Sequence, residues 1–429
     1  MSLLFFLLFL ALMILGVPIV FALILAPAIS LMVEGKDVFL PFLIQRLYNG
    51  IDSFPLMAIP FFILAGEVMN AGKITEHLVN FSKALIGHFR GGLAQVNILS
   101  SILFAGMSGS AVADTSALGS MLIPAMEKNG YSRKFSAAVT AASSVIGPII
   151  PPSGIMIIYA YIMNVSVGGL FAAGMIPGLM VGCGLMGITW YLSKKRNYPV
   201  AGRRATLKER AVATKDAFWP LLTPIILIGG ILTGVFTPTE AAAVAAGYAL
   251  LVSLFISRSL KFGDLPKVLR EAAISSGVIL LLVGAAMSFS SIVTLSGAAG
   301  YLTNLVLMVS DNRLVILFLF NILLFFVGMF LDAGPAILIL GPVLGPVAAE
   351  MGVDPLHFAV IMCVNVTVGL ATPPMGLILF VASSLSKESI EDITREILPF
   401  LAVEVIVIFL ITFFPPLCLF IPHLLGFGT

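Results

Sequence analysis

Long apolar runs alternate with short polar segments along the whole chain. Most of the runs reach or exceed the roughly 20 residues that a helix needs to cross about 30 Å of hydrocarbon. The runs cover residues 3–33, 51–70, 92–126, 135–163, 167–192, 217–236, 239–257, 272–296, 314–349, 357–386 and 397–426. This pattern predicts an all-α polytopic membrane protein. The first run lacks a basic start and a small-residue cleavage site, so we expect a retained membrane helix rather than a removed leader.

The composition excludes an ordinary soluble protein. Apolar residues make up 59% of the 429 residues, charged residues only 10%, and the mean hydropathy is +1.12, whereas soluble domains are about one quarter charged. A net charge of +2 without a basic, aromatic-rich stripe predicts no nucleic-acid partner and leaves the lipid bilayer as the environment. Cys183, Cys363 and Cys418 lie far apart inside apolar runs, which predicts neither a disulfide framework nor a metal site.

The longest polar segment, residues 193–216, sets the predicted orientation because short loops rich in Lys and Arg stay in the cytoplasm. Its basic residues are Lys194, Lys195, Arg196, Arg203, Arg204, Lys208, Arg210 and Lys215. Counting spans outward from this loop places 20 of the 23 Lys and Arg residues inside and leaves Lys36, Arg46 and Arg313 outside. We therefore expect a multi-pass protein of a bacterial inner membrane, with a cytoplasmic N-terminus and a periplasmic C-terminus.

The run 92–126 differs from a spanning helix. The segments on both sides of it, 73–90 and 127–134, are basic (Lys73 among their residues), which places both ends on the cytoplasmic side. Each half has about 16 residues, or about 24 Å of helix, and Gly106 and Gly109 interrupt the middle. The pattern predicts a re-entrant helical hairpin.

The second half of the chain repeats the first. A shift of 222 positions places Gly106 on Gly328, and it places the pattern Gly-x-x-x-Pro-Pro-x-Gly of residues 147–154 on residues 369–376. We expect one repeat over 1–216, with a first hairpin at 92–126, a broken helix at 135–163 and the basic loop 193–216. The second repeat covers 217–429, with a hairpin at 314–349 and a broken helix at 357–386.

The charges of equivalent loops indicate that the repeats have inverted topology. The loop after the first hairpin holds Glu127, Lys128, Arg133 and Lys134, a net +2. Its counterpart after the second hairpin holds Glu350 and Asp354, a net −2. Inverted repeats place equivalent loops on opposite sides of the membrane, where opposite charge is expected.

Four interruptions indicate a secondary transporter with its site near the midplane, between the repeats. They are the hairpin tips at 106–110 and 328–335 and the Gly- and Pro-rich breaks at 147–154 and 369–376. Freed backbone carbonyls and the hydroxyls of Ser108, Ser110, Ser153, Thr367 and Thr372 suit Na⁺. Half-helix N-termini suit a carboxylate. The alternative is that Gly and Pro only permit kinks and close packing.

Several motifs resemble the large membrane subunit of tripartite ATP-independent periplasmic (TRAP) transporters, of the DctM and SiaM type. They are residues 54–66 (FPLMAIPFFILAG), 106–114 (GMSGSAVAD), 147–154 (GPIIPPSG), 237–243 (TPTEAAA) and 369–376 (GLATPPMG). The resemblance covers the whole chain, and the amino-acid sequence is most similar to the sialic-acid branch of the family.

The resemblance implies an elevator-type fold and Na⁺-driven import of an organic acid, sialic acid in this branch. It also implies a small four-helix membrane subunit and a periplasmic binding protein as partners. The first implied Na⁺ site uses Gly106, Ser108, Ser110, Gly147 and Ser153. The second uses Gly328, Gly369, Thr372 and Met375. Because Ile150 stands where the second repeat has Thr372, the two sites differ in their ligands.

Few charged side chains are expected at the midplane. Ser110, Asp332 and Ser153 are candidate substrate contacts, and Asp332 could alternatively serve a cation, a proton or only the hairpin structure. Asp114 is either a helix cap or part of the site. We expect Glu67, Glu240 and Glu404 to have structural pairing roles.

Three other functions compete with this hypothesis. Residues 106–109 (GMSG) match the wording of intramembrane serine proteases, but His77, His88, His357 and His423 all lie away from the expected depth of Ser108, so a catalytic base is not expected. The chain is therefore not predicted to be an enzyme. A channel would need a continuous polar pore. A stand-alone Na⁺/organic-anion symporter or ion exchanger of similar fold stays open.

Overall fold

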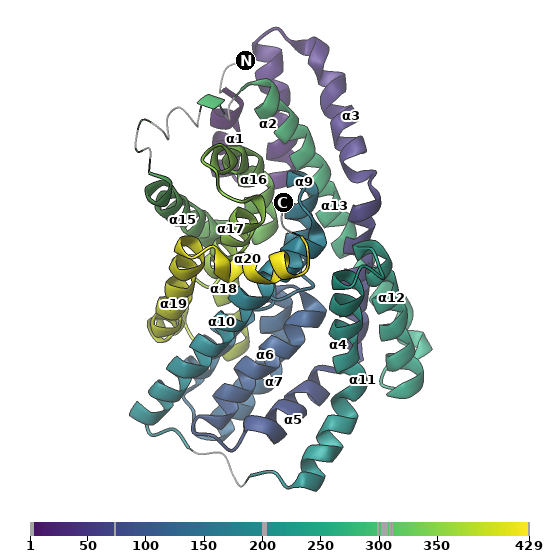
Figure 1. The fold of residues 1–429 in the computed structure, drawn as a ribbon, viewed down its shortest axis with the longest axis vertical. Coiled ribbons are helices and arrows are strands. Elements are labelled where there is room, and N and C mark those ends of the chain that lie inside the picture. The colour runs from purple at the N-terminus through teal and green to yellow at the C-terminus, as the bar shows by residue number, and fades with distance from the viewer. Residues whose placement is uncertain are drawn as a thin grey trace.

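The computed structural model describes residues 4–72, 74–199, 204–297, 300, 301, 308, 310 and 312–427, and its named elements are all helices (Figure 1). This confirms the predicted all-α class. Eight of the described helices are long and apolar enough to cross a membrane. The α-helices outside the hairpins and broken helices are α1 (Leu4–Ile14), α2 (Ile19–Val33), α3 (Leu40–Ile51), α4 (Ala58–Ala71), α5 (Ile74–Ile86), α10 (Val167–Lys195), α11 (Leu207–Leu232), α12 (Pro238–Leu251), α13 (Leu265–Leu295), α19 (Ile390–Phe413) and α20 (Pro416–Leu424).

Both predicted hairpins are present, with bounds within two residues of those expected. The first consists of α6 (Gly92–Ser108) and α7 (Ala111–Lys128), and the second of α15 (Arg313–Phe330) and α16 (Ala333–Glu350). The first tip turns at Gly109, whose φ of +59° favours glycine because other residues rarely adopt this left-handed conformation.

Both predicted broken helices are present as well. The first consists of α8 (Arg133–Ser144) and α9 (Gly154–Met163), and the second of α17 (Pro355–Gly369) and α18 (Leu377–Ser386). The breaks contain the Pro pairs 151–152 and 373–374, each joined by a cis peptide bond. Proline in these segments removes backbone donors, so a continuous helix does not form.

Contacts with α19 show that the two broken helices enter the molecule from opposite ends. At the start of α8, Lys134 Nζ lies 2.9 Å from Asp392 Oδ2 near the start of α19. At the start of α17, His357 Nε2 lies 2.7 Å from the carbonyl oxygen of Ile411 near the end of α19. Residues 392 and 411 are about 28 Å apart along a helix. The geometry confirms the inverted arrangement.

Several of the remaining helices form a layer beside the hairpins and broken helices. In Figure 1, α3, α4, α11, α12 and α13 lie along one side, whereas α15, α17 and α19 lie on the other. Helix α13 packs against α2, α3 and α4, and α12 packs against α4. One contiguous core of buried apolar residues joins both groups.

Three predicted segments differ from the structure. The run 3–33 is two packed helices, α1 and α2, separated at Gly16 and Pro18, and not one spanning helix. The run 397–426 is likewise divided between α19 and α20 at Pro415. The basic loop is shorter than 193–216, because α10 continues to Lys195 and α11 begins at Leu207.

These differences bear on the predicted termini. The cytoplasmic N-terminus was inferred by counting 3–33 as one span, and that premise is wrong. Phe427 packs against Gly168 and Gly169 at the start of α10, opposite to the basic end of that helix. This placement agrees with a periplasmic C-terminus. Orientation in the membrane and the division of the chain at residue 216 stay predictions, and Lys73 and Arg203 lie outside the described residues.

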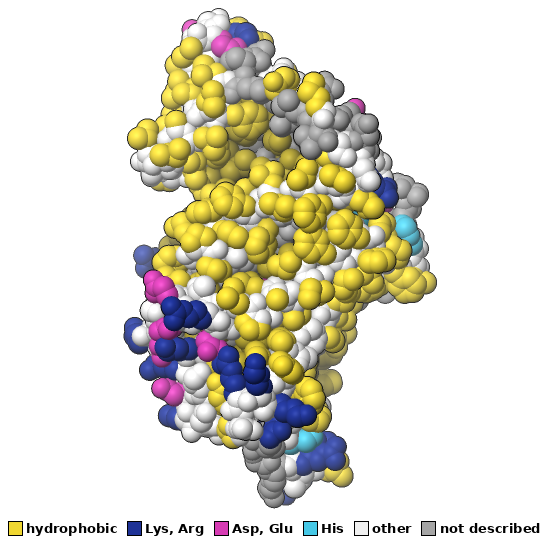
Figure 2. Space-filling view, turned by 90° about the vertical axis from the view of Figure 1, so that its left-hand side faces the viewer, with side chains coloured by type: hydrophobic (Ala, Val, Ile, Leu, Met, Phe, Trp, Pro, Cys, Tyr) yellow, Lys and Arg dark blue, Asp and Glu magenta, His cyan; other side chains and the backbone are white. Residues whose placement is uncertain are grey.

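Charged side chains are confined to part of the surface. Figure 2 shows most of the visible Lys and Arg side chains gathered with Asp and Glu toward the lower end of the face, a few charged side chains at the upper end, and a band of hydrophobic side chains between them. The ion pair between Arg196 and Glu396 joins the cytoplasmic ends predicted for α10 and α19, with a distance of 2.5 Å between Nη1 and Oε2. The apolar band is what a lipid-facing surface requires.

Candidate functional site

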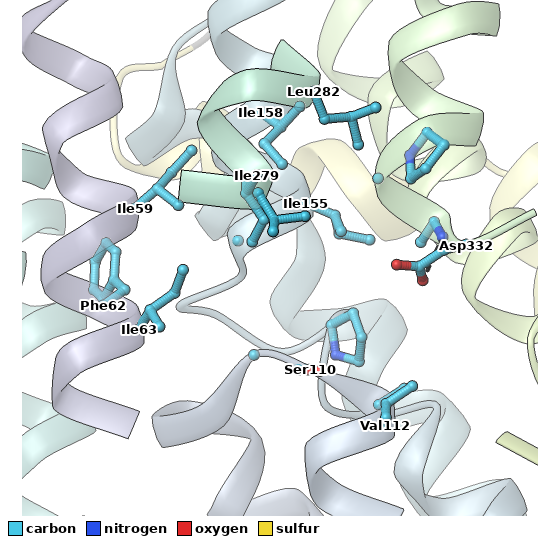
Figure 3. A pocket seen from close by; sticks show the side chains of 18 of the residues that line it. Ile59, Phe62, Ile63, Ser110, Val112, Ile155, Ile158, Ile279, Leu282 and Asp332 are labelled. Atoms are coloured by element: carbon cyan, nitrogen blue, oxygen red, sulfur yellow. Dashed lines mark hydrogen bonds between the residues drawn. The ribbon is translucent and has the colours of Figure 1, made fainter. Parts of the chain in front are cut away.

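A central cavity of about 510 Å³ lies between the two hairpin tips (Figure 3). The first tip contributes Ser108 and Ser110, and the second contributes Asp332. Helices α2, α4 and α13 supply an apolar wall. In Figure 3, Ile59, Phe62 and Ile63 of α4 lie on the side of the cavity opposite to Asp332. Among the described residues that line the cavity there is no Lys, Arg or His.

Three half-helices begin at this cavity. The lining includes Ala111 at the start of α7, Gly154 at the start of α9 and Ala333 at the start of α16. The first backbone N–H groups of a helix lack partners within the helix and carry partial positive charge. The cavity can therefore hold a carboxylate without a basic side chain, as the sequence predicted.

Each of these helices has a side-chain cap. The Ser110 Oγ accepts from the N–H of Ala113 at 3.4 Å, and the Asp332 Oδ1 accepts from the N–H of Ala333 at 2.8 Å. Ser153 is fully buried; its Oγ donates to the Pro148 carbonyl and accepts from the Met156 N–H. Ser110 and Asp332 are exposed to the cavity, but Ser153 does not line it.

The first hairpin and the first break meet at Asp114. This carboxyl group is fully buried, and its Oδ1 accepts a hydrogen bond from the Ser108 hydroxyl. Its Oδ2 has no hydrogen-bond partner among the described residues. A Cβ atom built on Gly147 would lie 2.3 Å from that oxygen. Gly147 therefore leaves room for this buried carboxylate oxygen, where a side chain would displace it.

The other residues of the predicted first Na⁺ site lie in the two segments that meet here. Ser108 lies at the end of α6, Gly106 is buried one turn before Ser110, and Gly109 touches the break, because its built Cβ would lie 2.9 Å from the Pro152 carbonyl oxygen. The hydroxyls of all three predicted serine ligands already form local hydrogen bonds: Ser108 with Asp114, Ser110 with Ala113, and Ser153 with Pro148 and Met156.

The second hairpin and the second break meet through backbone atoms. A Cβ built on Gly369 would lie 2.6 Å from the Cα of Gly328, so these two predicted site residues touch. The N–H of Gly376 donates to the carbonyl of Met329 at 3.0 Å. Thr372 is buried and donates to the Val368 carbonyl, and Met375 is 47% exposed.

Buried hydrogen bonds fasten each hairpin to its broken helix. In the first half, Asn97 donates to Thr140 at 2.6 Å, and Ser101 donates to Ser143 at 2.9 Å. In the second half, the amide group of Asn365 donates to the Oδ1 of Asn321 at 2.7 Å. Such pairs join the incoming arm of each hairpin to the half-helix before the break.

A smaller cavity of about 250 Å³ adjoins the central one. Both cavities are lined by Ser108 and Ser110, and the smaller one extends along α4 to Glu67 and Asn70. These residues lie in the last two turns of α4, before the predicted cytoplasmic segment 73–90. The first tip is thus exposed toward the side that we expect to be cytoplasmic.

The structure bears on the expected roles of three acidic residues. Asp114 is not the cap of α7, since Ser110 has that position, so the alternative of a site residue remains. Its side chain lies one turn into the helix and faces another segment, which local sequence patterns do not reveal. Glu240 forms a capping box with Thr237, as a structural role requires. Glu404 is fully buried without a hydrogen-bond partner among the described residues, so its predicted pairing is wrong.

No described His, Cys, Asp or Glu residues form a group of three or more that could hold a metal ion. The candidate cation ligands are therefore carbonyl and hydroxyl oxygens with Asp114. The described cavity lining places no histidine beside Ser108, which leaves the protease alternative without a base at that residue. His357 is buried at the start of α17, the end of that helix away from the break, and its Nε2 is hydrogen-bonded to the Ile411 carbonyl.

Comparison with known proteins gives the same family that the sequence motifs resemble. The family model described as "Tripartite ATP-independent periplasmic transporter, DctM component" matches residues 6–417. The chain is 42% identical to the sialic acid TRAP transporter large permease protein SiaM of Vibrio cholerae, covering 96% of each chain. It is 36% identical to the C4-dicarboxylate TRAP transporter large permease protein DctM of Rhodobacter capsulatus, covering 99% of each chain.

The fold also resembles that of a solved transporter. The YdaH transporter of Alcanivorax borkumensis superimposes with a TM-score of 0.66 over 91% of this chain and 90% of that chain, at 16% sequence identity. At this identity the likeness concerns the fold alone.

Proposed function

Because this chain belongs to the DctM component family of TRAP transporters and is a large permease of the inner membrane, we propose that it moves an organic anion into the cell together with Na⁺. The observation that carries this proposal is the central cavity between two hairpin tips that enter from opposite ends of the molecule. Inverted repeats with broken helices are the usual frame of secondary transporters.

The proposed Na⁺ sites lie where each hairpin meets its break. In the first site, the free Oδ2 of Asp114 joins Ser108 and the backbone near Gly106 and Gly147. In the second site, the contact between Gly328 and Gly369 brings carbonyl oxygens of both segments together. Hard cations such as Na⁺ prefer oxygen ligands, so both donor sets fit.

The proposed motion is of the elevator type. The buried hydrogen bonds from Asn97 to Thr140 and from Asn365 to Asn321 hold each hairpin to its broken helix. Helix α7 packs against α18 and α16 packs against α9, so both tips move as parts of one body. The side chains that α2, α4 and α13 present to the cavity are apolar and supply a surface past which that body can slide, whereas the hydrogen bond from the Tyr161 hydroxyl of α9 to the Gly50 carbonyl of α3 would have to break.

The proposed substrate for the first test is sialic acid, since the Vibrio cholerae relative is named for it. The Rhodobacter capsulatus relative is named for C4-dicarboxylates at a similar identity, which makes these acids the second choice. The proposed partners are a small four-helix membrane subunit and a periplasmic binding protein that delivers the acid.

The test is uptake of radiolabelled sialic acid into proteoliposomes that contain this chain and its small-subunit partner. Uptake is measured with and without the binding protein, and with and without an inward Na⁺ gradient. We expect uptake only when both are present. Uptake without the binding protein would favour the stand-alone symporter, and uptake without the Na⁺ gradient would contradict Na⁺ coupling.

A further inference from the structure

One polar contact joins the two groups of helices that the proposed motion would separate. The Tyr161 hydroxyl of α9 donates to the carbonyl oxygen of Gly50 in α3 at 3.1 Å. Among the described residues, it is the one side-chain hydrogen bond between the wall helices (α2, α3, α4, α11, α12 and α13) and the hairpins with their broken helices. Sliding of one group past the other would break it.

The acceptor is a carbonyl group that the end of α3 leaves without a backbone partner among the described residues. Helix α3 ends at Ile51, and the last four carbonyls of a helix have no partner within it. Gly50 is buried, and a Cβ atom built on it would lie 2.7 Å from Cβ of Met287 in α13. A Cβ built on Gly284 of α13 would likewise lie 2.8 Å from the Leu47 carbonyl oxygen. This close contact of α3 with α13 fixes the acceptor among the wall helices.

The donor belongs to the group of helices that moves. Helix α9 begins at the cavity with Gly154 and packs against α16 of the second hairpin. Tyr161 lies seven residues further along α9, about 10 Å toward the side that we expect to be periplasmic. The smaller cavity extends the other way, to Glu67 and Asn70 near the end of α4.

The hydrogen bond therefore stabilises the conformation in which the first tip is exposed toward the expected cytoplasmic side. At about 3.6 Å between donor and acceptor a hydrogen bond no longer exists, so a slide of about 1 Å is enough to break this one. The conformation that breaks it leaves the carbonyl of Gly50 without its donor. A buried polar group that loses its partner costs free energy, which favours the conformation seen here.

We propose that Tyr161 is a latch that favours the conformation open to the cytoplasm and so sets the resting position of the protein. The inference rests on the elevator motion proposed above. One neutral hydrogen bond changes an equilibrium by about twofold to tenfold. A bond of this strength biases the resting position and still breaks in every transport cycle.

The test is Tyr161→Phe, which removes the hydroxyl and keeps the ring. The reporter is Val112→Cys, a cavity position, in a chain whose three native cysteines are replaced. A membrane-impermeant thiol reagent is applied from either side to oriented vesicles that contain the complex with the small subunit, in Na⁺ without substrate. We expect the ratio of periplasmic to cytoplasmic labelling rates to rise about fivefold. An unchanged or lower ratio would overturn the proposal.

Tyr248→Phe is the matched control. The Tyr248 hydroxyl of α12 donates to the Trp219 carbonyl of α11 at 3.0 Å, so the same chemical group is lost within the wall helices. We expect a small loss of Tm and an unchanged labelling ratio. A ratio that rises equally in both variants would also overturn the proposal, because it would follow from lost stability alone.

The same experiment separates this inference from the proposed function. Labelling from both sides, with equal ratios in the parent and in Tyr161→Phe, would overturn the latch while alternating access stands. Labelling from one side only, in both proteins, would contradict the latch and the proposed motion together. Labelling from the cytoplasmic side alone in the parent, but from both sides in Tyr161→Phe, would support both.

Discussion

The two hairpin tips are related by sequence and symmetry, yet they contact their broken helices by different means. In the first half a buried side chain, Asp114, fills the space that Gly147 leaves open. In the second half Gly328 and Gly369 touch through their backbones, and the position equivalent to Asp114 is Ala336. The comparison teaches that the two repeats join hairpin and break by different chemistry, so that the two proposed Na⁺ sites would depend on a carboxylate in one half and on backbone shape in the other.

The largest effect is expected where backbone meets backbone. In Gly369→Ala, the new Cβ would lie 2.6 Å from Cα of Gly328. The atoms that it would meet belong to the backbone, so no flexible side chain can move aside to make room. Overpacking costs up to about 3 kcal/mol, which equals more than about a hundredfold in an equilibrium constant. We expect Na⁺-dependent uptake to fall by about this factor.

The matched control for that substitution is Gly247→Ala in α12, where no atom lies within 4 Å of the built Cβ. Both variants are compared by uptake per amount of folded protein, which is measured by gel filtration. Wild-type uptake in Gly369→Ala would show that the second hairpin and its break do not need close contact.

The next effect concerns the carboxylate of the first half. Asp114→Asn keeps the side-chain volume beside Gly147 but removes the charge that we assign to Na⁺ binding. Charge-assisted contacts contribute about 1.5–3 kcal/mol, so the Na⁺ concentration for half-maximal uptake should rise about tenfold or more. A Na⁺ titration measures it, with Glu240→Gln at the start of α12 as the control for charge loss elsewhere. An unchanged titration would remove Asp114 from the site.

A smaller effect is expected for the hydroxyl of the second half. The Thr372 hydroxyl donates to the Val368 carbonyl, and we attribute the second site mainly to backbone oxygens. Thr372→Val removes one hydrogen bond, worth about 1 kcal/mol, and should change the same Na⁺ titration by about threefold to fivefold at most. A change as large as that of Asp114→Asn would contradict the difference between the two halves.

The smallest effect on transport is expected in the hydrogen bonds that fasten each hairpin. Thr140→Val removes the partner of Asn97 in the first half. Polar contacts between membrane helices contribute about 0.6 kcal/mol on average and at most about 1.7 kcal/mol. We expect a lower Tm with an unchanged Na⁺ titration. A shifted titration without loss of Tm would mean that Thr140 acts on the ion site itself.

Sequence patterns predicted the parts of the fold that depend on local chemistry. The clustered Gly and Pro residues of 147–154 and 369–376 predicted the two breaks, and the opposite loop charges indicated inversion. The breaks at Pro18 and Pro415 were missed because apolar residues continue on both sides, so hydropathy gives no boundary. Pro27, by contrast, lies inside the continuous helix α2.

The site could be predicted only in part for a related reason. Ser110 directly follows Gly109 and Asp332 comes four residues after Gly328, so local patterns place both at the hairpin tips, and both line the cavity. The role of Asp114 depends on its distance from Gly147, which belongs to a different segment of the chain. The unpaired state of Glu404 likewise results from what packs around α19 and not from its own sequence.

The central claim is that the cavity between the tips is the transport site and opens to the two sides of the membrane in turn. Its most direct test is Val112→Cys, a cavity position, in a chain whose Cys183, Cys363 and Cys418 are replaced. Membrane-impermeant thiol reagents are applied to oriented vesicles from either side. We predict labelling from both sides, with Na⁺ and substrate changing the ratio, and none at the buried control Ala138→Cys. Labelling from one side only, under every condition, would contradict the account.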